Sequence, residues 1–229
     1  MSEQEIYQLP IASDGPDLAL AMHRRGFPAK HIARGIDAWD AHDAASERAR
    51  ELCRAFVGDW VNRTQIGPEN ARERLGKGLL IYGTPSTGKT TLACAVAYEI
   101  RRHGAAVRFI TAADFVAALG DENKLRTLAE RGDTRALEEF WGIRHLIAHV
   151  RRVPLLVLDD LGREHRTATD MARDEIARLL RQRHAAAKPT IVTTNFPPDA
   201  WRDLYDPATA EFAYEAFDMI KLVGKGFRR

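Results

Sequence analysis

The sequence predicts an α/β fold in which helices flank a parallel β-sheet. Residues 78–82 are a short apolar run of the kind that forms a buried strand, a glycine-containing loop follows at residues 83–90, and residues 91–103 have a helical pattern. The same alternation continues along the chain, with strand patterns at residues 106–110, 155–158 and 190–194. Strands that alternate with helices are typical of a parallel sheet, because each connecting helix packs back onto it.

Length and composition are those of an ordinary soluble protein. The 229 residues suffice for one α/β domain with a small appendage, but not for two large domains. The net charge of +2 permits nucleic-acid binding without arguing for it, since local patches matter more than the sum. Cys53 and Cys94 are widely separated, which predicts neither a disulfide framework nor a zinc site.

The N-terminus resembles no targeting signal. It begins Met-Ser-Glu-Gln-Glu, which is acidic, and it has no apolar core of signal-peptide length. No apolar run approaches the length of a membrane span. We therefore expect a cytoplasmic protein with no membrane partner.

The glycine-containing loop matches the P-loop pattern G-x-x-x-x-G-K-[ST] at residues 83–90. In a strand, loop and helix of this order, backbone N–H groups and the positive end of the helix dipole converge on a volume that accepts a polyphosphate. Lys89 would reach the β- and γ-phosphates, and the Thr90 hydroxyl would bind Mg²⁺. The residues expected to bind the nucleotide are Gly83, Thr84, Pro85, Ser86, Thr87, Gly88, Lys89, Thr90 and Thr91.

Two carboxylates follow the strand at residues 155–158. Asp159 and Asp160 occupy the position at which P-loop enzymes hold Mg²⁺. We expect Asp159 to bind the hydrated metal and Asp160 to polarise the attacking water. Taken alone, an Asp-Asp pair also fits a turn.

Asn195 ends the next strand pattern, at residues 190–194. Its amide would lie where it can contact the γ-phosphate. The competing interpretation is a turn residue before Phe196, Pro197 and Pro198.

Five other segments have recognisable patterns. A short helix is expected after Asp14 and Pro16, and a long one at residues 41–62 with an apolar stripe. Residues 120–152 are helical in pattern and longer than one crossover helix requires. The chain closes with a helix at residues 208–217 and a strand at residues 219–223. The stripe of the long helix consists of Leu52, Phe56, Val57 and Trp60.

Together these elements resemble the AAA+ ATPases of the DnaC/IstB group, which comprises bacterial or phage helicase loaders and the ATPase helpers of transposases. The resemblance covers the chain from about Phe27 to its end. Its specific segments are the P-loop strand and loop, the apolar-Asp-Asp-Leu-Gly stretch at residues 155–162, the strand at residues 188–195 and the tail at residues 220–228.

The resemblance implies a P-loop NTPase fold of AAA+ type, with a parallel sheet of about five strands and a lid subdomain that is reduced or absent. It implies that ATP and Mg²⁺ are the cofactors. Asp160 stands where most AAA+ proteins have Glu, and inherits the catalytic role by position. Residues 1–35 would be an N-terminal extension that binds a partner, and residues 36–229 the ATPase domain. Within the extension, Leu18, Leu20 and Met22 are the candidate apolar anchors, although a disordered terminus with no role also fits this acidic segment.

The chain departs from the family pattern at two places in the site. Ser86 stands where the family usually has Gly, at a variable position of the general motif, so nucleotide binding should survive. The trans-acting arginine expected before the last strand has no counterpart, since Glu211-Phe212-Ala213-Tyr214 lies there. Arg202 is the nearest substitute, and Arg183 and the tail arginines are others.

The functional expectation is an ATP-dependent replication factor that loads a replicative helicase onto single-stranded DNA as an ATP-dependent homo-oligomer. The long helical stretch fits this function, because relatives place an extra helix there that faces DNA. The candidate phosphate contacts are Lys124, Arg126, Arg131 and Arg135, although such a charge run also fits a solvated face.

Three alternatives remain on sequence grounds. One is a transposase helper bound to duplex DNA, and another is a nucleotide-dependent DNA- or protein-binding module with little hydrolysis. The third, a small-molecule kinase, is disfavoured because such enzymes rely on mobile lids rich in arginine rather than on this strand pattern.

Overall fold

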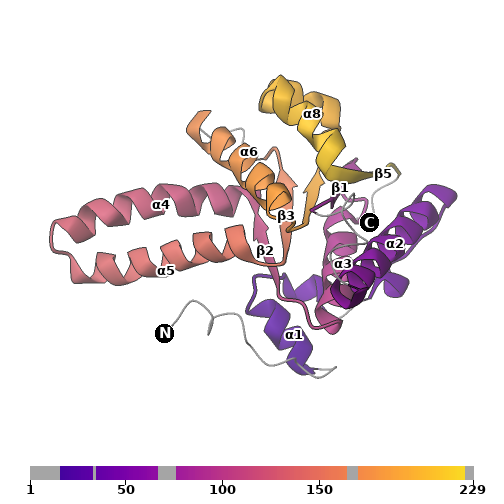
Figure 1. Ribbon diagram of the computed structural model, residues 1–229, viewed down its shortest axis with the longest axis horizontal. Coiled ribbons are helices and arrows are strands. Elements are labelled where there is room, and N and C mark those ends of the chain that lie inside the picture. The colour runs from indigo at the N-terminus through magenta and orange to yellow at the C-terminus, as the bar shows by residue number, and fades with distance from the viewer. Residues whose placement is uncertain (1–15, 33–34, 67–75, 164–169, 225–229) are drawn as a thin grey trace.

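The structure, a computed structural model, describes residues 16–32, 35–66, 76–163 and 170–224. Its centre is a sheet of five parallel strands in the order β2-β3-β4-β1-β5 (Figure 1). This confirms the predicted parallel sheet of about five strands. The strands are β1 (Gly78–Gly83), β2 (Val107–Thr111), β3 (Leu155–Leu161), β4 (Thr190–Thr194) and β5 (Phe217–Leu222).

Helices cover both faces of the sheet. Successive strand residues point to opposite faces, so Leu79 and Ile81 pack with the first set of helices while Leu80 packs with the second. The first set is α1 (Pro16–His23), α2 (Ala44–Ile66) and α3 (Lys89–Arg102), with the 3₁₀ turns η1 (Ala29–His31) and η2 (Ile36–Ala38). The second set is α4 (Ala112–Glu130), α5 (Thr134–Arg152), α6 (Asp170–Ala185), α7 (Trp201–Leu204) and α8 (Pro207–Ala216), with the turn η6 (Pro198–Ala200).

The described part of the N-terminal segment is built into the core. Leu18, Met22 and Phe27 are buried in one cluster with β1 and α3. The prediction that Leu18 and Met22 are exposed anchors for a partner is therefore wrong, and of the three predicted anchors only Leu20, at 49% exposed, faces solvent. The domain boundary at residue 35 stays a prediction.

Helix α2 begins three residues later than expected because Asp43 caps it. The Asp43 carboxylate accepts a hydrogen bond of 2.7 Å from the backbone N–H of Ser46. Its buried stripe also differs from the prediction, since Leu52 is 37% exposed and Cys53 takes its place in the core. The buried stripe consists of Ala49, Cys53, Phe56 and Trp60.

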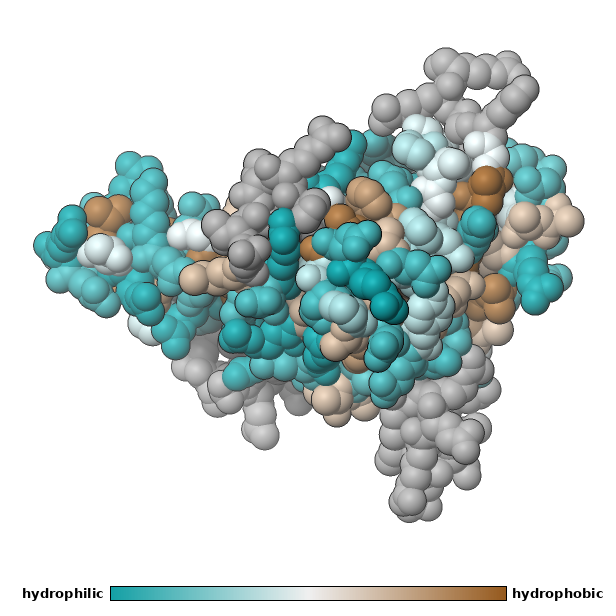
Figure 2. Space-filling view, turned by 90° about the horizontal axis from the view of Figure 1, so that it is seen from above, coloured by the Kyte–Doolittle hydropathy of each residue, from teal (hydrophilic) through white to brown (hydrophobic). Residues whose placement is uncertain are grey.

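The long helical stretch at residues 120–152 belongs to two antiparallel helices, α4 and α5, and not to one. A turn at residues 131–133 separates them, with Gly132 in the left-handed region (φ 94°) and the Asp133 carboxylate capping α5. The Thr111 side chain caps α4 by accepting a hydrogen bond of 3.0 Å from the Asp114 N–H. This hairpin projects from the sheet (Figure 1), and its surface in Figure 2 is mostly hydrophilic with isolated apolar side chains.

In the described part of the chain, no helix is long and apolar enough to cross a membrane.

Candidate nucleotide-binding site

Strand order brings the predicted site residues together. Strand β4 lies between β1 and β3, so the carboxyl ends of these three strands meet at one edge of the sheet. Ligands of open parallel sheets bind at that edge. A cleft of about 630 Å³ lies there. Its lining includes the predicted residues Pro85, Ser86, Gly88, Lys89, Thr90, Thr91, Asp159, Asp160 and Asn195.

The P-loop has the geometry that its sequence requires. Gly83 has φ 136°, and a Cβ there would collide with the carbonyl oxygen of Leu222 on β5. Helix α3 starts at Lys89, so its positive end faces the cleft. The Lys89 ammonium donates hydrogen bonds to the carbonyls of Gly83 (3.1 Å) and Thr84 (2.7 Å). Burial lowers the pKa of Lys89, against the opposing effect of the Asp160 and Asp159 carboxylates.

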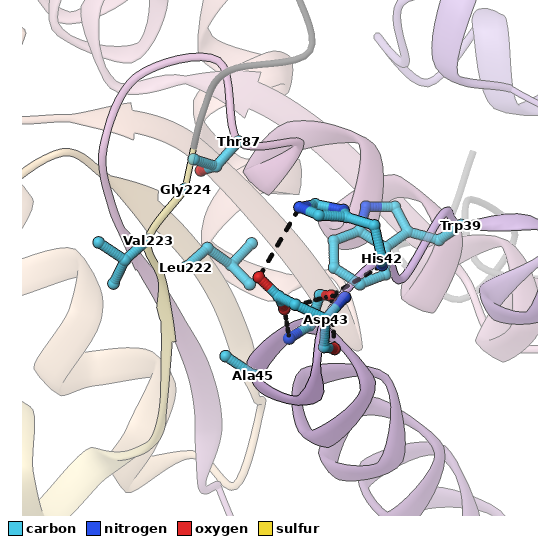
Figure 3. Close-up of a pocket in the computed structure, with 9 residues that line it drawn as sticks. Trp39, His42, Asp43, Ala45, Thr87, Leu222, Val223 and Gly224 are labelled. Atoms are coloured by element: carbon cyan, nitrogen blue, oxygen red, sulfur yellow. Dashed lines mark hydrogen bonds and ion pairs between the residues drawn. The ribbon is translucent and has the colours of Figure 1, made fainter.

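Segments outside the P-loop hydrogen-bond to it and hold it in place. The Thr84 N–H donates to the Leu222 carbonyl (3.2 Å) and the Thr84 hydroxyl to the Gly224 carbonyl (3.4 Å). The Trp39 indole donates to the Gly88 carbonyl (3.4 Å). Thr87 lines a small pocket behind the loop with Trp39 and the end of β5 (Figure 3), and its hydroxyl donates to Thr84 (2.9 Å). Gly83, Thr84 and Thr87 therefore shape the loop rather than line the cleft.

Asp159 forms a hydrogen-bonded cluster with two threonines. Its Oδ1 accepts from the hydroxyls of Thr90 (2.8 Å) and Thr193 (2.5 Å). Asp159 is 5% exposed, and burial raises its pKa, while the bonds from Thr193 and Thr90 lower it. Hydroxyl and carboxylate oxygens are hard ligands that fit Mg²⁺, which keeps several waters and shares phosphate oxygens with its protein site.

Asp160 adopts an unusual backbone conformation at the edge of this cluster. Its φ is 56°, in the left-handed region, where the pairing of β3 with β4 shifts register. Its N–H donates to the Thr193 hydroxyl (3.0 Å), and its Oδ2 lies 3.0 Å from the Arg163 guanidinium. Such strain persists only where the surroundings impose it, and it is common at functional sites.

The tail candidates Arg228 and Arg229 lie outside the described residues. The other two candidate arginines lie in different environments. Arg183 is buried and donates to the carbonyls of Val150, Val153 and Pro189 and to the Thr190 hydroxyl. These hydrogen bonds join the end of α5 to the start of β4 and leave the guanidinium buried. The prediction that Arg183 could act on the nucleotide of another subunit is therefore wrong. Arg202 on α7 is exposed and does not line the cleft of its own chain, so its catalytic role stays a prediction.

Several residues of the site escaped the sequence analysis. Thr193 and Arg163 contact the two aspartates, but a threonine inside a strand and an arginine in a loop carry no motif. The opposite wall of the cleft comes from the N-terminal segment, where His31 Nδ1 lies 3.1 Å from the Thr91 hydroxyl. Burial lowers the pKa of His31, as does the charge of Lys30. The residues of this wall are Pro28, Lys30, His31, Gly35, Ala38, Trp39 and Asp40.

The sheet order, the P-loop and the aspartates at the end of β3 define a P-loop nucleotide-binding protein of AAA+ type. A family model described as IstB-like ATP binding protein matches residues 74–216. The chain belongs to this family.

Solved structures share the fold. The DnaC helicase loader is 24% identical, with a TM-score of 0.62, covering 84% of this chain and 98% of that one. DnaI is 19% identical, with a TM-score of 0.58, covering 88% of this chain and 94% of that one. The replication initiator DnaA bound to AMPPCP and single-stranded DNA is 20% identical, with a TM-score of 0.59, covering 86% of this chain and 51% of that one. A search of curated protein sequences gave no match.

Proposed function

We propose that this protein is an Mg²⁺-dependent ATPase that hydrolyses ATP to ADP and phosphate while loading a replicative helicase onto single-stranded DNA. Hydrolysis would be slow and stimulated by the partner. The observation that carries the hydrolytic part is the placement of Asp159, hydrogen-bonded to Thr90 of the P-loop and to Thr193 of β4, with Asp160 beside it in the same cleft.

Each residue has a defined role in this proposal. Lys89 would exchange its bonds to the loop carbonyls for the β- and γ-phosphates. Thr90 and Asp159 would hold Mg²⁺, which when bound would neutralise phosphate charge. Asp160 would accept the proton of the attacking water, and Asn195 would donate to the γ-phosphate. Arg163 engages one Asp160 oxygen and so orients that carboxylate.

The second wall of the cleft would bind the nucleoside. Residues in the ranges 28–31 and 35–40 line the cleft together with the P-loop. His31 contacts Thr91 of α3, and Trp39 donates a hydrogen bond to Gly88 of the P-loop. A nucleotide whose phosphates lie on the P-loop would extend toward this wall.

Structural neighbours support a role in replication. The proteins described as the DnaC helicase loader and DnaI match over almost their whole length, and the DnaA neighbour was solved with single-stranded DNA. We therefore propose single-stranded DNA, a replicative helicase and further copies of this chain as partners. The IstB-like family match favours a second candidate function, that of a transposase helper.

Steady-state ATP hydrolysis with and without single-stranded DNA tests the ATPase. Asp160→Asn should bind ATP but lose about 10²-fold in turnover, because it removes the proton acceptor while Asp159 keeps the metal. Asp174→Asn on the exposed face of α6 is the matched control and should hydrolyse at the parental rate. Parental turnover in Asp160→Asn would refute its role.

Affinity capture from the native cell extract with ATP present tests the partner. Recovery of a replicative helicase supports the loader. Recovery of a transposase instead would establish the second candidate function. A chain that binds ATP and is not stimulated by DNA or by its captured partner would be a nucleotide-dependent binding module.

A further inference from the structure

A cluster of two arginines and a histidine lies at the opposite end of the sheet from the nucleotide cleft. Arg108 is near the start of the edge strand β2, and His149 is near the end of α5. Arg25 follows α1, and its carbonyl accepts a hydrogen bond of 3.0 Å from the Phe109 N–H, which fixes this segment beside β2. The Arg25 guanidinium lies 3.2 Å from His149 Nε2.

The cluster has no counter-charge among the described residues. No carboxylate in the described ranges forms an ion pair with Arg25 or Arg108, and the buried Nε of Arg108 has no hydrogen-bond partner there. Burial lowers the pKa of Arg25, Arg108 and His149, and neighbouring positive charges lower each of them further. Charged side chains that are removed from water are normally paired.

The donors of this cluster match an oxyanion. Arg is always a donor, so His149 Nε2 must accept from Arg25, and the neutral ring then carries its proton on Nδ1. Two guanidinium groups therefore lie beside a neutral imidazole, without an acceptor of full negative charge among the described residues. Planar guanidinium groups match the oxygen spacing of phosphate.

The surrounding charge favours a nucleic-acid strand as the source of that phosphate. Residues 140–152 of α5 carry Arg144, His145, His149, Arg151 and Arg152 and no acidic side chain. The facing residues 112–120 of α4 add only Asp114, and Arg151 is paired with Glu175 of α6 at 3.1 Å. By contrast, residues 121–139 at the outer end of the hairpin carry six acidic side chains against four basic ones. The root of the hairpin, and not its tip, is therefore its basic part.

An aromatic stripe leads from solvent to the cluster. Trp141, His145 and His149 are spaced four residues apart on one face of α5, and the ring centroids of Trp141 and His145 are 6.3 Å apart. Trp141 is 48% exposed, and eight residues of helix separate it from His149 by about 12 Å. Exposed aromatic rings beside cationic groups are the usual surface for single-stranded bases.

We propose that Arg25, Arg108 and His149 form an oxyanion site that holds a backbone phosphate of a single nucleic-acid strand. Nucleic acid as the source rests on the proposed function, whereas the oxyanion site itself does not. The site lies outside the basic residues that the sequence pattern singles out at the hairpin tip.

The first test addresses the site alone. Inorganic phosphate is titrated into the protein in the presence of Mg²⁺ and excess ADP, and the imidazole signals of His149 are followed by NMR. The parent should show a saturable shift that Arg25→Gln/Arg108→Gln lacks. Unmoved His149 signals in the parent would overturn the site. The double variant should melt no lower than the parent, because it removes two repelling cations, and a lower melting temperature would indicate a structural role instead.

The second test addresses the source of the phosphate. Binding of a labelled oligothymidylate with ATP is measured by anisotropy across a salt series. Arg25→Gln/Arg108→Gln should weaken binding about tenfold and reduce the log–log salt slope by about 0.7 for each phosphate that an arginine no longer neutralises. Arg24→Gln/Arg48→Gln removes the same charge from exposed positions and should bind like the parent.

Two outcomes would overturn the nucleic-acid assignment. One is equal oligothymidylate affinity in the two double variants. The other is a parent that binds polyglutamate through Arg25 and Arg108 and ignores the oligonucleotide, which would identify an acidic protein as the occupant. A parent that shows the phosphate shift at His149 but binds no oligonucleotide refutes DNA binding in the proposed function and leaves the oxyanion site standing.

Discussion

Lys89 supplies the positive charge on which nucleotide binding in the cleft depends. Among the described residues its ammonium hydrogen-bonds to loop carbonyls, which it can exchange for phosphate oxygens. Lys89→Ala should weaken ATP binding at least about tenfold, the cost of losing a charge-assisted hydrogen bond. A nucleotide titration followed by calorimetry measures this. Lys221→Ala, an exposed lysine of β5, is the control and should bind like the parent. Unchanged affinity in Lys89→Ala would show that the P-loop assignment is wrong.

Ser86 has a left-handed backbone (φ 64°) at the P-loop position where the resembled family has glycine. A side chain in this region costs about 1–2 kcal/mol, while glycine loses about 0.5–1 kcal/mol more entropy on folding. Ser86→Gly should therefore raise the free energy of unfolding by about 0.5–1 kcal/mol. Ser86→Ala keeps the strain and should give no gain in denaturant melts. Equal stability of the two variants would contradict the strain.

At the scale of elements, the α4–α5 hairpin depends on one glycine for its turn and tolerates another in its helix. Gly132 has φ 94° at the turn, whereas Gly120 lies inside α4, and a Cβ at either position would meet open space. The effect of an alanine at either position on stability therefore depends only on the backbone conformation that the position requires. Gly132→Ala should destabilise the protein by about 1–2 kcal/mol, and Gly120→Ala should stabilise it by up to about 1 kcal/mol.

Urea unfolding of the two alanine variants measures these opposite signs. If the domain unfolds in more than one step, hydrogen exchange of the α4 and α5 amides gives the same comparison locally. A stabilising Gly132→Ala would show that residues 131–133 do not form this turn.

At the scale of the whole molecule, His149 links stability to pH because it contacts Arg25 and lies near Arg108 and Arg183. Burial, reinforced by these charges, lowers its pKa from 6.5 to about 4. Between these values the unfolded chain binds a proton that the folded chain does not. Stability from this group is therefore fully present above about pH 6.5 and falls as the pH drops toward 4.

Unfolding in urea at pH 7 and pH 5 measures this contribution. Without solvent screening, the free energy of unfolding would be about 2 kcal/mol lower at pH 5 than at pH 7. Because the imidazole is partly exposed, we expect about 1 kcal/mol. His149→Gln should lose that much less stability than the parent between the two pH values. An identical loss in both proteins would mean that His149 titrates normally.

Elements that depend on local sequence pattern could be predicted, whereas those that depend on tertiary packing could not. The strand at residues 190–194 and the helix capped by Thr111 follow from local pattern and capping, and the structure has both. The hairpin was not predicted as two helices, because its turn contains only one glycine within a continuous apolar periodicity. Apolar character alone predicts Leu52 in the core. In the structure, packing against α3 buries Cys53 instead.

The α/β class, the P-loop and the two aspartates could all be predicted from the sequence, because they depend on local periodicity and on a motif whose chemistry restricts its residue types. Which distant groups meet depends instead on how the elements pack. Strand β4 between β1 and β3 brings Thr193 to Asp159, and the N-terminal segment returns to form the second wall of the cleft. Arg25, Arg108 and His149 are likewise far apart in the chain and converge only because α1 and α5 both pack beside β2. Contacts between residues so distant in sequence leave no local pattern, since their spacing is set by how whole elements pack.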